Sequence, residues 1–282
     1  MAKLLDGKTC AAHITSRIEQ RVLQIKGRKP TLAFILVGQN SASQSYVRMK
    51  KKACAETGIR SILIELSASI AEADLIAQVS MLNQDVSVDG ILIQLPLPAH
   101  IDEKMVMQTI DPIKDVDGFH PINIGKMLLG DPTARLPCTP LGIQTLLDYY
   151  NISVSGKHVV IIGRSNIVGK PLAAILMQKR ASCNATVTVC HSKSEKLEQL
   201  TQSADILIAA IGRPHFITRE HVLNGVIVID VGINRVDGRI IGDVDFDAVS
   251  EKAAWISPVP GGVGPMTIAS LLQNTLYCFE HR

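Results

Sequence analysis

The segment Val159–Pro171, VVIIGRSNIVGKP, constrains this 282-residue chain more than any other. Four β-branched residues lead directly into Gly163, and an apolar helical pattern follows Lys170. A strand, a glycine turn and the first turn of a helix form a phosphate site, because unpaired backbone N–H groups and the helix dipole favour an anion there. The usual dinucleotide fingerprint is G-x-G-x-x-G, but here Ser165 replaces the second glycine and Gly169 comes one residue late. The turn alone is therefore a weak indication of a dinucleotide site.

Short apolar runs alternate with helical patterns along the whole chain, which is typical of parallel sheets covered by helices on both faces. The strands expected in the first half are 31–37, 61–66 and 90–93, and those in the second half are 157–162, 185–190, 204–211 and 226–231. Residues 125–136 contain Gly130, Asp131 and Pro132 and are expected to be an irregular linker. Because the glycine turn follows the first strand of a βαβ series, as the dinucleotide motif requires, the second half is predicted to bind a dinucleotide.

Composition excludes several classes of protein. A net charge of +3 without a long basic run argues against nucleic-acid binding, and the sequence has no apolar run long enough to span a membrane. The N-terminus lacks the apolar core of a signal peptide. The six cysteines are scattered without a C-x-x-C pair, which favours reduced thiols over disulfides or a metal site. We therefore expect a cytoplasmic enzyme or binding protein with neither a nucleic-acid nor a membrane partner.

Candidate functional residues follow two expected strands of the first half. Tyr46 and Lys50 are four apart and share one face of a helix that begins right after the 31–37 strand, where α/β sheets place ligands. The lysines at 50–52 are otherwise compatible with a solvated basic face. Gln94 ends the 90–93 strand before a Leu-Pro-Leu-Pro segment. Asp117 lies in a turn-rich acidic segment, where carboxylates either bond their own backbone or hold a polar heterocycle.

The residues around the second strand favour NADP over NAD as the cofactor. An NAD site normally has an acidic residue near the end of its second strand, for the ribose 2′-hydroxyl. Here residues 190–194 read CHSKS, and Glu195 is the first carboxylate after the strand. Arg164 inside the glycine turn and the hydroxyl of Ser192 suit a 2′-phosphate instead.

Residues 257–267, SPVPGGVGPMT, concentrate glycine and proline before a final amphipathic helix. Such a loop either connects two domains or lets backbone groups approach a flat ligand closely, and we favour a ligand wall.

Six separate motifs, in the same order, are those of a known enzyme family. They are YVRMK at 46–50, GILIQLPLP at 90–98, DVDGF at 115–119, GRSNIVGKP at 163–171, DVGIN at 230–234 and PVPGGVGPMT at 258–267. Along nearly its whole length the chain resembles the bifunctional methylenetetrahydrofolate dehydrogenase/cyclohydrolase family. The last glycine of that family's glycine turn also comes one residue late. The resemblance implies NADP-dependent oxidation of 5,10-methylenetetrahydrofolate to 5,10-methenyltetrahydrofolate, then hydrolysis to 10-formyltetrahydrofolate, in one-carbon metabolism.

The resemblance also implies roles for individual residues. Lys50 would catalyse the hydrolysis, held by a hydrogen bond to Gln94, and Asp117 would bond the pterin ring and complete the catalytic set. Tyr46 would stack on the aromatic part of the folate. The remaining implied contacts are Gly261 and Gly262 to the substrate and Gly163, Arg164, Ser165, Ser192 and Ile233 to the dinucleotide. No metal is implied.

The expected fold is two α/β domains with a cleft between them, the second a Rossmann-type doubly wound parallel sheet. Residues 1–138 with 265–282 would form the folate-binding catalytic domain, because the last helix packs on the first domain in the family, and residues 139–264 would form the NADP-binding domain. A homodimer is implied by the family alone.

Three alternatives remain open: a family member that kept only the dehydrogenase, another NADP dehydrogenase such as one acting on shikimate-like hydroxy acids, and a non-enzymatic dinucleotide sensor. Lys50 and Gln94 argue against the first, and Tyr46 with the Gly/Pro wall argues against the second. A sensor would have no reason to keep Lys50 on the aromatic face of its helix.

Overall fold

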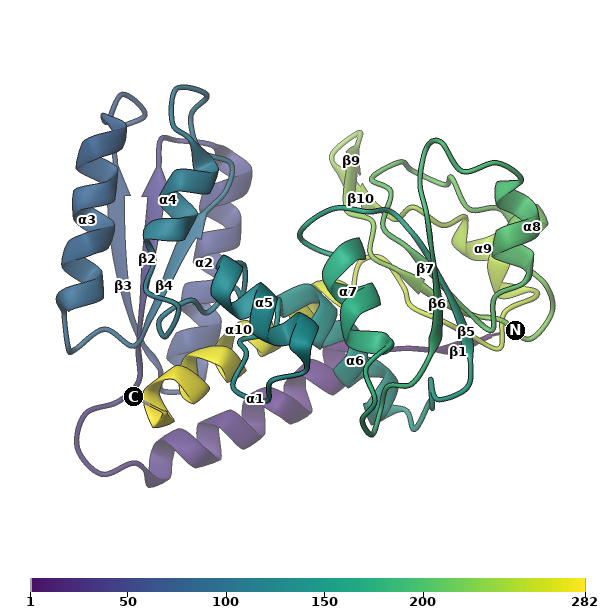
Figure 1. Cartoon of the computed structure of the whole chain (residues 1–282), viewed down its shortest axis with the longest axis horizontal. Helices are drawn as coiled ribbons and strands as arrows, with labels where there is room; N and C mark the ends of the chain where they lie inside the picture. Colours follow the sequence, from purple (N-terminus) through teal and green to yellow (C-terminus); the bar gives the residue numbers. More distant parts are fainter. Residues whose placement is uncertain (1, 282) are drawn as a thin grey trace. The chain divides into compact units, whose positions relative to one another are not determined.

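The computed structural model describes residues 2–281 and divides into two compact units (Figure 1). The six-stranded unit comprises the chain up to Ala12 together with Thr139–Thr267, and the three-stranded unit comprises His13–Cys138 together with the chain from Ile268 onward. Two helices, α1 (Gly7–Gln24) and α10 (Val263–Glu280), each begin in the six-stranded unit and end in the three-stranded unit. Each unit is an α/β fold with a parallel sheet, as the strand–helix alternation predicted.

The six-stranded sheet is parallel throughout. Its strands, in spatial order, are β1 (Lys3–Leu4), β11 (Trp255–Ile256), β8 (Ile227–Asp230), β7 (Ile206–Ala209), β5 (His158–Ile162) and β6 (Thr186–Cys190). If β5, the strand before the glycine turn, is counted as the first, then β5, β6, β7, β8 and β11 are strands one to five along the chain. From the β6 edge they lie in the spatial order 2-1-3-4-5. This is a doubly wound arrangement whose switch point lies between β5 and β7.

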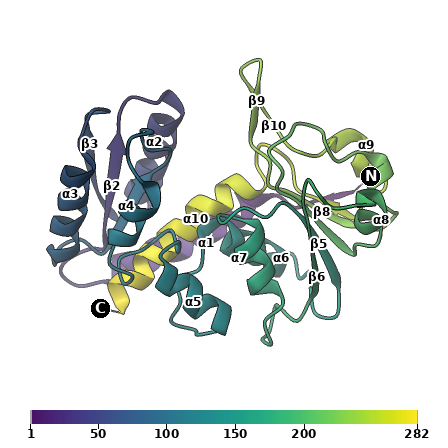
Figure 2. The ribbon, with the colours of Figure 1, turned by 45° about the horizontal axis from the view of Figure 1, so that its top comes forward.

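Helices cover both faces of this sheet. In Figures 1 and 2, α6 (Cys138–Tyr149) and α7 (Gly169–Leu176) lie on one side of the strands, and α8 (Leu197–Gln202) and α9 (Phe246–Ser250) lie on the other. A 3₁₀ turn, η1 (Arg219–His221), precedes β8. Burial on both faces explains why strands β5, β7 and β8 are continuous apolar runs.

Residues 2–12 were predicted to belong to the first domain, but the structure groups them with the six-stranded unit. The reason is β1, which pairs in parallel with β11 at Lys3–Trp255 and Leu4–Ile256. A two-residue strand whose partner lies about 250 residues further along leaves no recognisable pattern in the sequence.

The three-stranded sheet is also parallel, in the order β3 (Arg60–Leu66), β2 (Thr31–Val37), β4 (Gly90–Gln94). The central strand β2 is buried on both faces. Leu32, Phe34 and Leu36 pack into one apolar core, which includes residues of α1, α2 (Ser41–Glu56) and α10. Ala33 and Ile35 pack into a second core with α3 (Glu72–Gln84) and α4 (Glu103–Thr109). The period-2 alternation of β2 therefore separates two helical layers.

The linker expected at residues 125–136 is partly wrong, because α5 (Pro121–Leu129) is a helix. The side chain of His120 accepts a hydrogen bond from the N–H of Ile122 at its start, and Gly130 ends it in the left-handed conformation. Gly130 was read as a sign of irregular chain, whereas it is the C-cap of a helix.

A short antiparallel hairpin, β9 (Asn234–Val236) and β10 (Arg239–Ile241), stands apart from the main sheet. Its turn residues Asp237 and Gly238 both have positive φ angles, of 49° and 77°. Asp-Gly in this conformation is the preferred two-residue hairpin turn. The hairpin lies in the segment that follows β8.

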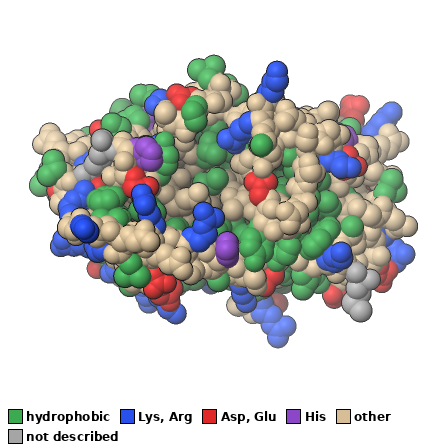
Figure 3. Space-filling view, turned by 90° about the horizontal axis from the view of Figure 1, so that it is seen from below, with side chains coloured by type: hydrophobic (Ala, Val, Ile, Leu, Met, Phe, Trp, Pro, Cys, Tyr) green, Lys and Arg blue, Asp and Glu red, His purple; other side chains and the backbone are tan. Residues whose placement is uncertain are grey.

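Among residues 2–281, no helix is long and apolar enough to cross a membrane. On the face drawn in Figure 3, lysine and arginine side chains are scattered and acidic side chains lie among them. The six cysteines are buried free thiols.

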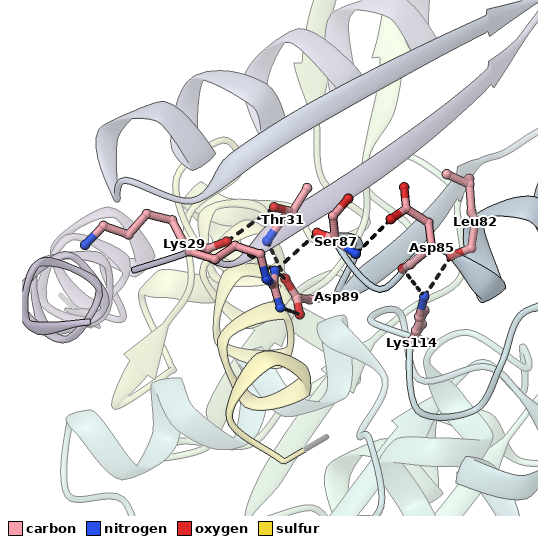
Figure 4. A network of polar contacts seen from close by, with 8 residues as sticks. Lys29, Thr31, Leu82, Asp85, Ser87, Asp89 and Lys114 are labelled. Carbon is pink, nitrogen blue, oxygen red and sulfur yellow. Dashed lines mark hydrogen bonds and ion pairs between the residues drawn. The ribbon is translucent and has the colours of Figure 1, made fainter. Parts of the chain in front are cut away.

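A polar network lies at the amino ends of β2 and β4 (Figure 4). The fully buried carboxylate of Asp89 accepts hydrogen bonds from the guanidinium of Arg28 and, at 2.8 Å, from the N–H of Thr31. Nearby, the ammonium of Lys114 donates to the carbonyls of Leu82 and Asp85, both at 2.8 Å, and thereby caps α3. This network is at the opposite end of the sheet from the candidate site described next.

Candidate active site

The predicted Lys50–Gln94 pair is present in the three-stranded unit. Lys50 Nζ donates to Gln94 Oε1 at 3.1 Å, while Gln94 Nε2 donates to the carbonyl of Leu95 at 2.9 Å. The second bond fixes the amide so that its oxygen faces the ammonium. Gln94 is the last residue of β4, and α2 follows the neighbouring strand β2, so both residues lie at the carboxyl ends of adjacent strands. With strand order β3-β2-β4 this is the switch point, where open α/β sheets bind ligands.

Local sequence explains the placement of α2. The side chain of Asn40 accepts from the N–H of Ser43 at 3.0 Å and caps the helix. Tyr46 and Lys50, both half-buried, follow at helical spacing on one stripe. The Ser43 hydroxyl is buried and donates to the carbonyl of Leu95 at 3.3 Å, next to Gln94.

Asp117 comes close to Lys50 by a different route. An isolated parallel bridge between Ile91 and Asp115 lays the acidic segment alongside β4. Two residues further on, Asp117 interacts with Lys50. Burial raises the pKa of the Asp117 carboxyl, the positive charge of Lys50 opposes this shift, and the negative charge of Asp115 adds to it. The site therefore combines an amine, an amide and a carboxyl whose pKa is influenced by the charge of the amine.

The three carboxylates of the acidic segment have different roles. Asp115 is buried and accepts from the N–H groups of Gly118 and His120, at 2.9 and 2.8 Å, and from Asn123 Nδ2 at 2.9 Å. Asp111 accepts from the N–H of Ile113 at 2.9 Å. Both therefore organise their own loop, whereas the Asp117 carboxyl experiences the positive charge of Lys50.

Sequence reasoning missed two residues around Asp117. The buried thiol of Cys138 donates to the carbonyl of Val116 at 3.3 Å, and its interaction with the Asp117 side chain lowers the pKa of that carboxyl. Asn274, on α10, donates to the carbonyls of Val116 and Leu136 at 2.8 and 3.0 Å. The available signal was an amide within the apolar stripe of the last helix, where a buried polar group needs partners.

In the six-stranded unit, the close packing of the glycine turn explains why its sequence departs from the usual dinucleotide fingerprint. Gly163 has φ +128°, and a Cβ there would lie 2.1 Å from the carbonyl oxygen of Ala210. A Cβ on Gly169 would lie 2.0 Å from the carbonyl oxygen of Gly163. The Ser165 hydroxyl accepts from the N–H of Val168 at 3.1 Å and orders the longer turn. The late glycine is thus the position where α7 packs directly on the turn.

The two residues predicted to contact the 2′-phosphate follow the carboxyl ends of neighbouring strands. Ile162 pairs with Cys190, and the exposed Arg164 and Ser192 follow two residues after these partners. The loop after β6 is ordered by its own bonds, since the N–H of His191 donates to Ser194 Oγ at 2.9 Å. A cradle without Cβ atoms, a helix N-terminus and exposed cationic and hydroxyl groups fit a phosphorylated dinucleotide.

The other predicted residues of this unit are accounted for locally. Ile233 is 50% exposed. Gly261 has φ +114°, and its carbonyl accepts from the N–H of Lys8 at 3.1 Å. Gly262 is so close to Gly7 that a Cβ on Gly7 would lie 1.7 Å from its carbonyl oxygen. The Gly/Pro segment therefore packs tightly on the start of α1, and its contact with a ligand stays a prediction.

Comparison with known families decides what the two units are. Residues 5–117 match the tetrahydrofolate dehydrogenase/cyclohydrolase catalytic domain, and residues 137–282 match the NAD(P)-binding domain of the same family. The chain belongs to the tetrahydrofolate dehydrogenase/cyclohydrolase family. The family predicted from six motifs is thereby confirmed, as is the α/β fold class.

Individual members of this family are similar over their full length. "Bifunctional protein FolD" of Campylobacter curvus is 52% identical, with 99% of this chain and 96% of that protein covered. The crystal structure of the bifunctional enzyme FolD from Campylobacter jejuni has a TM-score of 0.97 at 49% identity, covering 100% of both chains. The Trypanosoma brucei FolD structure, complexed with NADP and an inhibitor, has a TM-score of 0.93 at 37% identity, covering 99% of this chain and 97% of that one.

A shikimate dehydrogenase solved with NADP+ has a TM-score of 0.52 at 12% identity, covering 88% of this chain and 94% of that one. At this identity the likeness shows the fold alone.

Proposed function

We propose that this chain oxidises 5,10-methylenetetrahydrofolate with NADP and then hydrolyses the resulting 5,10-methenyltetrahydrofolate to 10-formyltetrahydrofolate. The observation that carries the proposal is the Lys50–Gln94 hydrogen bond beside Asp117, in a chain that has both domains of the tetrahydrofolate dehydrogenase/cyclohydrolase family. Relatives about 50% identical over the full length are named as bifunctional proteins.

In the first reaction the protein binds and orients. NADP, when bound, supplies the ring that accepts a hydride. Gly163, Arg164 and Ser165 would hold its phosphates at the glycine turn, with Ser192 at the 2′-phosphate and Ile233 against the dinucleotide. Exposure of Arg164, Ser165 and Ser192 supports these contacts. The chain's contribution is to align two reactants, which can lower a barrier substantially without any protein group reacting.

In the second reaction Lys50 would move protons. Water adds to the cationic methenyl carbon and loses a proton, which gives a neutral carbinolamine. The hydroxyl of this intermediate then loses its proton to become the formyl carbonyl, while the bond from that carbon to one ring nitrogen breaks and this nitrogen is protonated, so one proton is released overall. An amine held by Gln94 can serve both transfers in turn. Asp117 would bond the N–H groups of the pterin, and Tyr46 would stack on the aromatic part of the folate. Gly261 and Gly262 are proposed as further substrate contacts.

The test is to mix the protein with 5,10-methylenetetrahydrofolate and NADP and to follow NADPH and the methenyl chromophore together. We expect Lys50→Met to keep forming NADPH while methenyltetrahydrofolate accumulates, because hydrolysis falls by about 100-fold or more without its proton-transfer group. Hydrolysis by Lys50→Met at the wild-type rate would refute the role of Lys50.

A matched control is available on the same helix. Lys52 is exposed and pairs with Glu56 at 3.7 Å, so Lys52→Met removes an equal charge two residues away from Lys50. We expect this variant to behave as wild type in both reactions. A wild-type protein that binds NADPH but forms no product would instead indicate a dinucleotide sensor, and one that never hydrolyses the methenyl compound would indicate a dehydrogenase alone.

Finer properties belong to the same proposal. We infer a cytoplasmic homodimer that prefers NADP to NAD and binds neither nucleic acid nor membranes. The preference is supported by Arg164 and Ser192 and by the lack of a carboxylate before Glu195. The interspersed charges in Figure 3 and the net charge of +3 agree with the absence of a nucleic-acid partner. Equal kcat/KM values with NAD and NADP would contradict the preference.

A further inference from the structure

A buried carboxylate organises the loop that follows β7. Asp243 is fully buried, and its Oδ2 accepts from the N–H groups of Ile211 and Gly212 at 2.6 and 2.9 Å. Its Oδ1 accepts from the N–H of Arg213 at 2.9 Å. Three successive backbone donors aimed at one point form a nest, an arrangement that binds anions in many proteins. Here the chain fills the nest with its own side chain.

The same carboxylate holds the start of the β9–β10 hairpin. Asn234 Nδ2 donates to Asp243 Oδ1 at 2.8 Å. Gly232 lies so close that a Cβ there would be 2.4 Å from the same oxygen. Both residues belong to the family motif at 230–234. Between them the backbone is fixed on both sides, and Ile233 projects outward with half of its surface exposed.

A second buried carboxylate holds Asp243 in turn. Asp230, the last residue of β8, accepts from the N–H groups of Asp243 and Val244 at 3.0 and 2.9 Å, and from the N–H of Gly232 at 2.8 Å. The two aspartates thus connect the ends of β7 and β8 to the segment after the hairpin. The arrangement leaves little freedom for any of these loops.

The location of the Asp243 nest gives it a functional meaning. The loop 211–213 follows β7, the neighbour of β5 across the switch point of the sheet. Its first turn begins at Ala210, whose carbonyl oxygen is in contact with the glycine turn at Gly163. Any displacement of the loop would therefore reach the turn proposed to hold the dinucleotide phosphates.

We propose that Asp243 is a positioning residue for the dinucleotide, which keeps the loop 211–213 and Ile233 in the arrangement that NADP needs. The inference rests on the proposed function, since it assigns the ligand of this unit. It concerns NADP binding and not the hydrolysis assigned to Lys50.

The direct test is Asp243→Asn. Each carboxylate oxygen of Asp243 accepts two of the four hydrogen bonds. Replacing either oxygen by an amide NH₂ therefore leaves two N–H groups without an acceptor, because the NH₂ is itself a donor. We expect the dissociation constant of NADPH, measured by fluorescence titration, and the KM for NADP to rise about tenfold. Hydrolysis of methenyltetrahydrofolate, assayed without NADP, should stay within about twofold of wild type.

Asp245→Asn is the matched control. It makes the same charge change two residues away, at the N-cap of α9, where Asp245 Oδ1 accepts from the N–H of Ala248 at 3.3 Å. We expect its NADPH affinity to equal that of wild type. If Asp243→Asn does not fold, Asn234→Ala removes only one of the four donors and should raise the dissociation constant about threefold.

The outcomes separate the inference from the proposed function. NADPH affinities for Asp243→Asn and Asn234→Ala that both match the Asp245→Asn control would overturn the inference. So would an equal loss of both activities with unchanged KM for NADP, because that pattern reports only a smaller folded fraction. Failure of the proposed function would instead appear as a wild-type protein that turns over no folate, while the NADPH titrations of the variants would still test the role of Asp243.

Discussion

Gly169→Ala tests the account of the late glycine. The new Cβ would lie 2.0 Å from the carbonyl oxygen of Gly163, 2.7 Å from its carbonyl carbon and 3.0 Å from the Cα of Arg164. All three are backbone atoms, which cannot rotate out of the way as a side chain can. The helix and the turn must therefore separate by about 1 Å to restore the closest contact that real Cβ atoms make, 3.0 Å.

The expected magnitude follows from this overlap. Overpacking of a close-packed site costs about 1–3 kcal/mol. Gly169 is the first residue of α7, so the substitution gains little from the preference of alanine for helix interiors. A loss of about 1–3 kcal/mol in the free energy of unfolding is expected. The effect on NADP should be larger, since a shift of about 1 Å at a positioning element can reduce the rate by about 100-fold.

The assay compares three quantities: urea unfolding, NADPH affinity and the two activities. Dehydrogenase kcat/KM for NADP should fall, while hydrolysis of methenyltetrahydrofolate persists in the folded fraction. Gly125→Ala is the control, because a Cβ there meets nothing within 4 Å inside helix α5. It should gain about 0.5–1 kcal/mol and keep both activities. Wild-type NADPH affinity in Gly169→Ala would refute the steric argument.

Two further predictions concern stability. Burial raises the pKa of Asp230 from 3.8 to about 6 in the folded protein, so the folded state binds this proton more tightly than the unfolded chain does. The stabilisation from this proton is complete below about pH 4 and is lost as the pH rises to about 6. The free energy of unfolding of Asp230→Asn should therefore rise by about 3 kcal/mol relative to that of the wild type between pH 4 and 7. This magnitude follows from a pKa shift of about 2 units at 1.36 kcal/mol each. Parallel stability curves in urea across this range would contradict the assignment. Asp89→Ala leaves the Arg28 guanidinium and the N–H of Thr31 without this acceptor, and should cost about 2–3 kcal/mol in urea unfolding. Its activity per folded molecule should be unchanged, because the network is at the amino ends of β2 and β4, and a selective loss of hydrolysis would show that the two ends of the sheet are coupled.

Local chemistry was readable from the sequence wherever the interacting groups are close in the chain. The strand, turn and helix at Val159–Pro171 occupy thirteen consecutive residues, and their apolar runs and glycines directly reflect backbone demands. Tyr46 and Lys50 share a helical stripe for the same reason. The six motifs then identified the family and, through it, the pairing of Lys50 with Gln94.

Other features were decided only by tertiary contacts. Cys138 and Asn274 meet beside Val116 although they are separated by 136 residues, and an amide in the apolar stripe of the last helix indicates only that Asn274 needs a partner, not which one. The nest around Asp243 joins residues about 30 positions apart, so no local pattern in the sequence marks it.

The sequence by itself determined the alternation of strands and helices, the glycine turn and the membership of the family, because periodicity and turn chemistry act over a few residues. Only the tertiary structure decided that Lys3 and Leu4 join the six-stranded sheet and that Asp115 bonds its own loop while the charge of Lys50 acts on Asp117. These outcomes depend on which buried donors and acceptors find partners across the fold, and that choice is made by the packing of distant segments.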